Sequence, residues 1–296
     1  MGTSTKQITK PFFRIAARTP LNIATERGKK LTEEIFGSGK WQLLPSTSEA
    51  NFYAVPANKA VYLAYAGLAS LWCIAYAAFH VADITSRQQR EPKGPEQTEI
   101  NIAPEFAARK IPEHIAYAKA LFRADQDWPD DLPTPPSSPE FDSFEGRVNN
   151  VFYGALSWIL LHEIAHVHRR DEKLLPVYLL VRQEYRADDF ATRWILDDAG
   201  DGLYREFRVL MIVVALAWLF LHEQTVGLGN DHPPTILRFR EASALFQTGD
   251  RSAGLENAGY VLKALLDPTT SAPQYDTSKE FFEWVSSRLE ILFPAA

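Results

Sequence analysis

Five consecutive residues, His162-Glu163-Ile164-Ala165-His166, have the residue types that bind a divalent metal ion and use it for hydrolysis. On a helix, positions i and i+4 lie one turn apart on the same face, so His162 and His166 can present two imidazoles to one ion. Glu163 lies between them, where it would act on a water at the metal as general base and later protonate the leaving amine. The spacing therefore predicts a hydrolytic metal centre on a helix.

The residues before this motif strengthen the prediction. Three fixed positions in five arise by chance in about one chain of this length in a hundred, so the motif needs support from its context. The preceding stretch 153–161 is strongly apolar and helical in pattern. Two histidines at the end of so apolar a helix are costly unless their nitrogens are satisfied, and a metal ion would satisfy them.

A second helix supplies candidate carboxylates. Glu184 follows His166 by 18 residues, which is enough for one helix to end and the chain to return. Glu184 and Asp188 share the apolar face of this helix, and an inward carboxylate must be paired or metal-bound. We expect Glu184 to be the third ligand of a zinc site and Asp188 to accept the N–H of a ligand histidine. The alternative is a surface ion pair with Arg182 or Arg186.

The spacing of the remaining histidines predicts their roles. His232, in Asp231-His232-Pro233, would either donate to the developing oxyanion near a zinc centre or cap the following helix, and the residues leave both roles open. His168 is two positions past His166, about 200° around the helix, so it should point away from the metal. The others have no partner at metal-ligand spacing and are expected to be structural: His80, His114 and His222.

At this point the chain resembles a known group of peptidases. The first motif, followed by Glu184-Tyr185-Arg186-Ala187-Asp188, is similar to the gluzincin pattern, in which a helix bearing Glu-x-x-x-Asp donates the third zinc ligand. His232-Pro233 with Arg238 resembles what membrane CAAX-processing-type metallopeptidases have after their ligand glutamate. With its 296 residues and a long apolar helix before the site, the chain most resembles the Lit-like phage-exclusion peptidases. The matching motifs span about 162–238.

The resemblance implies more than the motif. It implies a zincin-like helical metallopeptidase core that holds Zn²⁺, with Asp188 and Arg238 around the ligands. It also implies cytoplasmic cleavage of translation elongation factor Tu, set off by a phage-derived activator. No residue in the chain indicates the identity of the substrate, so that expectation rests on the resemblance alone.

Composition limits the class of protein. The hydrophobic fraction is 46% and the charged fraction 23%, as in an ordinary globular protein. A net charge of −6 argues against a nucleic-acid binder, although residues 1–60 have a charge of +5 and would suit a solvated face, an acidic partner or a membrane surface. The single cysteine, Cys73, lies in an apolar run, which is typical of a reducing compartment and favours a cytoplasmic protein.

One segment raises the question of a membrane. Residues 60–82 contain no Lys, Arg, Asp or Glu and are long enough to span a bilayer. Their alanine-rich composition gives little insertion energy per residue, so we expect a buried helix, with an inner-membrane anchor as the alternative. The apolar run 209–221 has 13 residues, which predicts a core helix too short to span.

The chain as a whole is predicted to be a single metallopeptidase domain over 1–296, mainly α and at most α+β, with a small sheet or a few short strands. We divide it into an N-terminal segment with the long apolar helix (1–90), an irregular Pro-rich connection (86–143), a zinc-binding catalytic core (144–245) and C-terminal helices (254–292). A short strand is expected at 51–55 and a turn at 36–40. Helices are expected at about 58–84, 113–124, 144–169, 176–198, 203–224, 234–247, 254–266 and 278–292.

Three other functions are compatible with these residues. The first is a regulatory peptidase that cleaves transcriptional repressors, because such enzymes follow the metal motif with a similar Glu-x-x-Ala pattern. The second is a non-catalytic helical interaction protein with a degenerate metal site, against which the intact Glu163 argues. The third is an integral-membrane peptidase anchored by residues 60–82.

Overall fold

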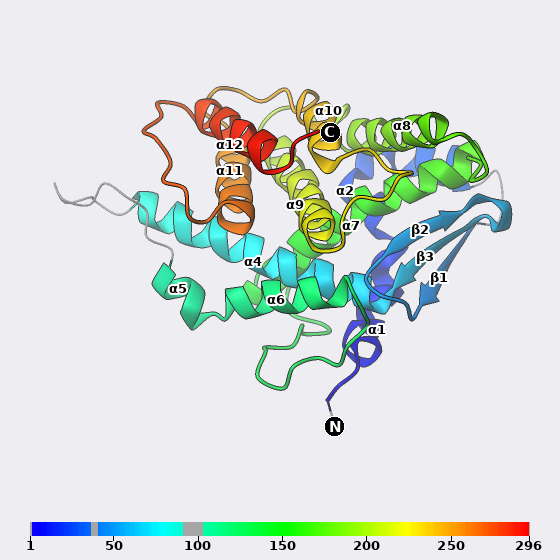
Figure 1. The fold of residues 1–296 in the computed structure, drawn as a ribbon, viewed down its shortest axis with the longest axis horizontal. Helices are drawn as coiled ribbons and strands as arrows, with labels where there is room; N and C mark the ends of the chain where they lie inside the picture. The colour runs from blue at the N-terminus through cyan, green and yellow to red at the C-terminus, as the bar shows by residue number, and fades with distance from the viewer. Residues whose placement is uncertain (1, 37–40, 91–102, 296) are drawn as a thin grey trace.

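The computed structural model describes residues 2–36, 41–90 and 103–295, and within these ranges the chain is mainly helical with one small sheet (Figure 1). The first helices of the chain are short, and two turns of other helix types join them. The N-terminal elements are α1 (Thr5–Ala16), α2 (Thr19–Ile23), η1 (Thr25–Arg27), α3 (Gly28–Lys30) and η2 (Leu31–Phe36). The later helices are α4 (Tyr65–Arg90), α5 (Ala103–Ala108), α6 (Ile111–Leu121), α7 (Phe144–Arg169), α8 (Val177–Leu196), α9 (Leu203–Val226), α10 (Thr235–Ser243), α11 (Ala253–Leu266) and α12 (Ser278–Leu292).

The core is built around α4, α7 and α9, which pack against one another. These helices are apolar on nearly all sides, and a helix of that kind must be covered by protein on every face. Two hydrogen bonds join buried polar side chains of these helices. Trp218 on α9 donates to the Ser70 hydroxyl on α4 at 2.8 Å, and Trp72 on α4 donates to Asn149 on α7 at 2.9 Å. These hydrogen bonds set how the three helices are aligned.

Two helices of the described ranges, α4 and α9, are long and apolar enough to cross a membrane by length and composition. The expectation that the 209–221 segment is too short to span is wrong for the helix that contains it, because this run lies within α9, which has 24 residues with charged side chains on either side of that run. In the most apolar part of each helix, 78% of the α4 residues and 61% of the α9 residues are buried inside the protein. This burial favours core helices, since core helices of large domains have the same composition as membrane spans.

The sheet has three strands: β1 (Gln42–Ser46), β2 (Phe52–Val55) and β3 (Ala60–Ala64). Their order is β1-β3-β2, with β3 parallel to β1 and antiparallel to β2, so β2 is an edge strand. Figure 1 shows the sheet beside the end of α7, and β2 and β3 pack against that helix. The short η3 turn (Pro56–Asn58) connects β2 to β3.

Most of the predicted elements are confirmed, with differences at their ends. Helices α7 and α12 have the expected bounds, and the strand expected at 51–55 is β2. The helix expected from 58 begins only at Tyr65, because the apolar residues before it are β-branched or paired in β3. The connection expected over 86–143 contains the end of α4, α5 and α6 in its described part. The turn at 36–40 lies almost entirely outside the described residues.

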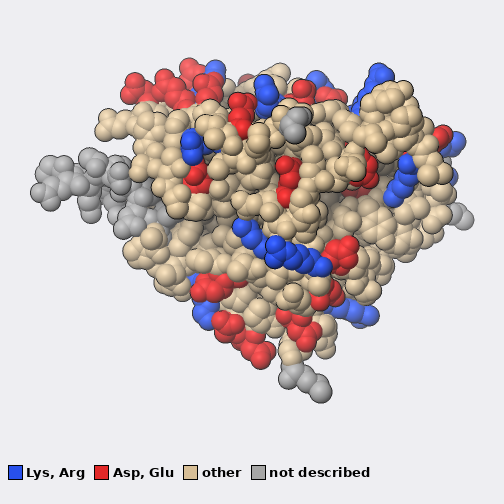
Figure 2. Space-filling model, in the orientation of Figure 1, with Lys and Arg blue, Asp and Glu red and all other residues tan. Residues whose placement is uncertain are grey.

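The surface carries charges of both signs. On the face shown in Figure 2, basic and acidic side chains are interspersed, and acidic side chains gather at the upper left edge and at the lowest part of the molecule.

One glycine fixes the distance between the first turn of α4 and the start of β2. A Cβ atom on Gly67 would lie 2.8 Å from the backbone oxygen of Asn51 and 3.1 Å from the ring of Phe52. A backbone oxygen cannot rotate away as a side chain can, so only glycine allows this approach. The absence of a side chain at Gly67 thereby allows strand β2 to pack closely against helix α4.

We predict that Gly67→Ala destabilises the protein by about 1–2 kcal/mol, since the overpacking cost of about 1–3 kcal/mol exceeds the gain in helix propensity of about 1 kcal/mol. The free energy of unfolding in urea measures this change. Gly28→Ala is the matched control, because a Cβ there meets nothing within 4 Å and φ is −54°. A Gly67→Ala protein as stable as the unmodified chain would contradict the prediction.

Candidate metal centre

The site is built on two antiparallel helices, α7 and α8. Helix α7 ends where Arg170 adopts a left-handed conformation with φ of 57°, and the backbone N–H of Asp171 then bonds to the His166 carbonyl at 3.1 Å. This turn reverses the chain, and α8 starts after Pro176. Trp158 on α7 donates to the Thr192 hydroxyl on α8 at 3.0 Å, both groups being buried. Packing of the two helices thus brings the 162–166 motif and the face of α8 together.

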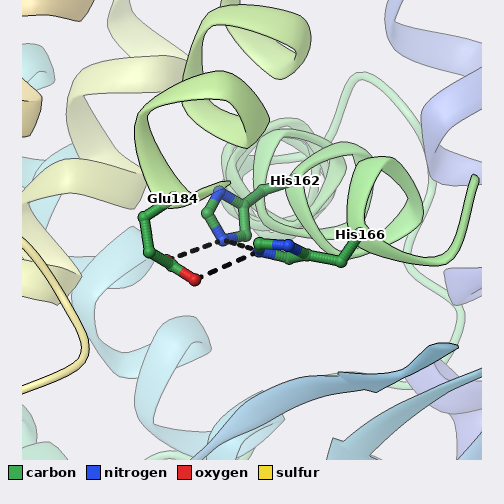
Figure 3. A group of neighbouring side chains, drawn as sticks. All are labelled: His162, His166 and Glu184. Atoms are coloured by element: carbon green, nitrogen blue, oxygen red, sulfur yellow. Dashed lines mark hydrogen bonds and ion pairs between the residues drawn. The ribbon is translucent and has the colours of Figure 1, made fainter. Parts of the chain in front are cut away.

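His162, His166 and Glu184 converge on one point between these helices (Figure 3). The Nε2 atoms of the two histidines lie 3.1 Å apart. Each Nε2 lies 3.3 Å from an oxygen of the Glu184 carboxylate. All three side chains are buried, with exposed fractions of 6 to 9%. The structure therefore brings together the three side chains that the sequence indicated as ligands.

These distances match the requirement of a small tetrahedral ion. Four ligands at about 2.0–2.1 Å from a zinc ion must be about 3.3 Å from one another. The two Nε2 atoms are 3.1 Å apart and each lies 3.3 Å from a different oxygen of Glu184, and one of these oxygens is buried without a hydrogen-bond donor among the described residues. The ligand set, two imidazoles and one carboxylate, is that of catalytic zinc sites with one open position. The residues therefore fit a zinc ion.

The outer nitrogens of both histidines are held by carboxylates. His162 Nδ1 lies 2.8 Å from Asp188 Oδ1, and His166 Nδ1 lies 2.8 Å from Asp171 Oδ2. Ionised carboxylates only accept hydrogen bonds, so each Nδ1 carries a proton and donates it. When neutral, each imidazole directs the lone pair of its Nε2 toward the other and toward Glu184. Three acceptors this close repel one another unless a proton or a metal cation lies among them.

Asp188 is further tied to an arginine on α10. Arg238 Nε and Nη2 donate to the two oxygens of Asp188, each at 2.7 Å, and both side chains are buried. Burial alone would raise the pKa of Asp188, but the guanidinium of Arg238 holds it below its usual value. The carboxylate is therefore ionised and fixed in two directions. A bidentate pair of this kind orients His162 from outside the cluster.

Asp171 was missed by the sequence analysis. It lies beyond the end of α7, so no helical periodicity relates it to His166, and only the reversal at Arg170 brings it back to the ring. Burial alone would lower the pKa of His166, but hydrogen bonds with Asp171 and Glu184 raise it to about 10. A metal ion that binds His166 through Nε2 would therefore have to displace a proton from the ring.

The cluster opens into a cleft of about 460 Å³. Glu163 lines this cleft beside the cluster and is 8% exposed, and burial raises the pKa of its carboxyl group. A carboxylate of raised pKa is a better base. The opposite wall is formed by the edge strand β2 and the residue before it, namely Asn51, Phe52, Tyr53 and Ala54. An edge strand and a candidate base thus face the same space.

His232 reaches the cleft from the turn before α10. Its Nε2 lies 3.7 Å from Glu184 Oε2, and its Nδ1 lies 2.9 Å from Asp231 Oδ1. Its side chain is 49% exposed, so it is open to a ligand in the cleft. The alternative role as a helix cap is wrong, because Pro234 is the N-cap of α10 and its first N–H donates to Glu223 at 2.7 Å.

The other histidines lie apart from the cluster. His168 is exposed on the outer side of α7, as expected. His222 stacks on the Trp218 ring with centroids 5.5 Å apart. His80 and His114 are buried on either side of Tyr76, each with its ring centroid 4.3 Å from that of the tyrosine. His222, His80 and His114 thus have structural contacts, and none of the four side chains belongs to the His162–His166–Glu184 cluster.

A relative, the "Cell death peptidase" of Escherichia coli (strain K12), is 26% identical over 129 residues, which cover 42% of this chain and 43% of that protein. The match thus spans less than half of the length of this relative. No solved structure matches the chain.

The profile of one protein family, described as Peptidase U49, matches residues 61–258, which is more than half of the chain and includes α4 and the whole candidate metal centre. Together with the peptidase relative, this match confirms the resemblance to the Lit-like peptidases. The chain therefore belongs to the peptidase U49 family.

Proposed function

We propose that this peptidase is a zinc-dependent endopeptidase whose ion is held by His162, His166 and Glu184. The observation that supports this most strongly is the convergence of the two Nε2 atoms, 3.1 Å apart, on the Glu184 carboxylate, with one of its oxygens 3.3 Å from each and both histidines oriented from behind by carboxylates. When bound, zinc supplies a Lewis acid that polarises the scissile carbonyl and lowers the pKa of water to about 7.

Side chains in the cleft would carry out the proton transfer and stabilise the developing negative charge. Glu163 lies in the cleft next to the ligands, where it takes a proton from the attacking water and returns it to the leaving amine. His232 is exposed to the cleft; as an imidazolium, with its Nδ1–H donated to Asp231, it would donate its Nε2–H to the carbonyl oxygen as negative charge develops there. Asp231, bonded to His232 Nδ1, orients that ring. A non-catalytic protein would have no use for a base in this position.

The edge strand β2 gives the cleft a means of holding a polypeptide. An extended peptide can add to an exposed sheet edge through backbone hydrogen bonds, which bind many sequences alike. Phe52, Tyr53 and Ala54 line the cleft opposite Glu163. A chain laid along β2 would have its backbone carbonyls beside the metal ligands, and this arrangement favours a protein substrate.

The family suggests the biological setting. We propose that the substrate is elongation factor Tu in the cytoplasm, that a phage-derived activator triggers its cleavage, and that the outcome is phage exclusion. The supports are the membership in peptidase U49 and the peptidase relative, whose name refers to cell death. The burial of α4 and α9 favours a protein that is not anchored by them.

We predict one zinc ion per chain after purification without chelators and incubation with zinc. Glu184→Gln removes the charged ligand and should lower zinc affinity by more than about 100-fold, because carboxylate binds zinc far better than amide. Metal analysis by mass spectrometry after dialysis measures the stoichiometry. Glu172→Gln, a nearby exposed carboxylate, is the control and should keep its zinc. Unmodified protein that holds no zinc would exclude the proposed centre.

Glu163→Gln should keep its zinc and lose activity by about 10²–10⁴-fold, because a general base contributes about that much and glutamine cannot accept the proton. The measurement is the rate of cleavage of purified elongation factor Tu, with and without phage lysate, and of an unfolded casein substrate. Cleavage of casein but not of elongation factor Tu would reject that substrate and leave the peptidase intact. Equal rates for the unmodified and Glu163→Gln proteins would contradict the role of Glu163.

The two supporting carboxylates should respond differently to replacement. Asp171→Asn and Asp188→Asn each weaken a hydrogen bond to a ligand histidine, which should lower zinc affinity by about 10–100-fold. Asp188→Asn also leaves the buried Arg238 without its counter-charge, which should cost about 3–5 kcal/mol of stability. Zinc titration and urea unfolding of both variants separate the two effects. Equal losses of stability would show that the Arg238 pair is not the reason for the difference.

A further inference from the structure

A second hollow adjoins the cleft, and nothing in the proposed chemistry uses it. It is a groove of about 940 Å³ between η2, the end of the sheet and the last turns of α7. Its walls are largely apolar, and they include Phe36, Trp41, Val55, Pro56, Ile164, Val167 and Leu174. The Phe36 and Trp41 rings stack with their centroids 4.4 Å apart. We refer to this hollow as the apolar groove.

The apolar groove is continuous with the catalytic cleft. Both hollows are lined by Pro56 and by the segment 171–173, so they share a wall. Strand β2 leads from one to the other, since Phe52, Tyr53 and Ala54 line the cleft and Val55 lines the groove. A peptide extended along β2 from the cleft would therefore run into the groove.

The charged residues that line the groove indicate which residues would flank an apolar segment bound in it. Three exposed cations line it, Lys59, Arg170 and Lys173. None of the three has a carboxylate of the described residues within salt-bridge distance, and Lys173 lies over the Tyr53 ring at 5.8 Å. Of the two carboxylates in the lining, Asp171 is already bonded to His166. The rim thus has unpaired positive charge available for an acidic partner.

We propose that the apolar groove is a substrate subsite, which binds an apolar segment on one side of the scissile bond with acidic residues next to it. Leu174 is the clearest contact, because its side chain is 97% exposed at the mouth of the groove, where an unbound leucine gains nothing from the fold. The inference rests on the proposed peptidase function, since it assigns the groove to the same polypeptide that enters the cleft.

The test is a binding measurement that does not depend on cleavage. The full chain carrying Glu163→Gln is loaded with zinc, and fluorescence anisotropy reports the binding of a labelled ten-residue peptide containing Asp-Phe-Leu-Asp. Two further peptides replace Phe-Leu with Ser-Ser or both Asp with Lys. We expect the first peptide to bind at least about tenfold more tightly than either, since burying one or two apolar side chains and pairing a charge exceed 1.4 kcal/mol.

Groove variants locate the binding. Leu174→Glu and Lys59→Glu should each lower the binding affinity for the Asp-Phe-Leu-Asp peptide by about tenfold. Leu174→Glu places a carboxylate against the apolar residues of the peptide, and Lys59→Glu places one against its acidic residues. Leu203→Glu and Lys10→Glu are matched controls, since these exposed residues lie in neither hollow. Equal binding of the three peptides, or equal binding by groove and control variants, overturns the proposal.

Two further outcomes identify other occupants. If Leu174→Glu changes the sedimentation coefficient of the peptide-free protein, the groove is an interface between copies of the chain, and the proposal is wrong. A longer peptide joins Asp-Phe-Leu-Asp to a casein-derived segment, and active protein should cleave it faster than the casein-derived segment alone. If the short peptide binds the groove but the longer one is not cleaved faster, the groove serves a separate ligand and the proposal is again wrong. Loss of all cleavage with peptide binding intact would instead reject the peptidase function.

Discussion

The repulsion between three acceptor atoms is the constraint on which the rest of the site depends. Two imidazole nitrogens and a carboxylate lie within 3.3 Å of one another in a buried position. Such an arrangement is stable only with a cation among the atoms, or if each donor is held so firmly that it cannot turn away. The fold supplies this restraint through Asp188 behind His162 and Asp171 behind His166.

The buried charged groups extend outward from the cluster, from Glu184 through Asp188 to Arg238. Glu184 and Asp188 on α8 are one turn apart, and Arg238 from α10 neutralises the second of them. Removing any member would leave its neighbour as an unpaired buried charge, which costs several kcal/mol. This explains why a helix far from the motif, α10, is part of the site. The site is rigid because three helices and one turn hold it, and each is anchored in the core.

The substrate side of the protein is built on different principles. The cleft and the apolar groove are bounded by an edge strand, a loop and exposed side chains, where backbone hydrogen bonding and burial of apolar surface determine binding. Shared walls link the two hollows to the metal ligands, since Asp171 lines both and also holds His166. Binding in the groove and the orientation of a ligand histidine therefore involve the same segment of chain.

The sequence by itself determined the helical core and the three candidate ligands. Periodicity places His162 and His166 on one helical face, and the apolar face of the next helix carries Glu184 and Asp188, so local pattern was sufficient. Only the tertiary structure decided the rest. Asp171 reaches His166 through a left-handed turn, Arg238 reaches Asp188 from a helix 50 residues away, and residues 60–64 pair as a strand although they read as helix. Each depends on contacts between segments distant in sequence, and periodicity holds information only about residues within one element.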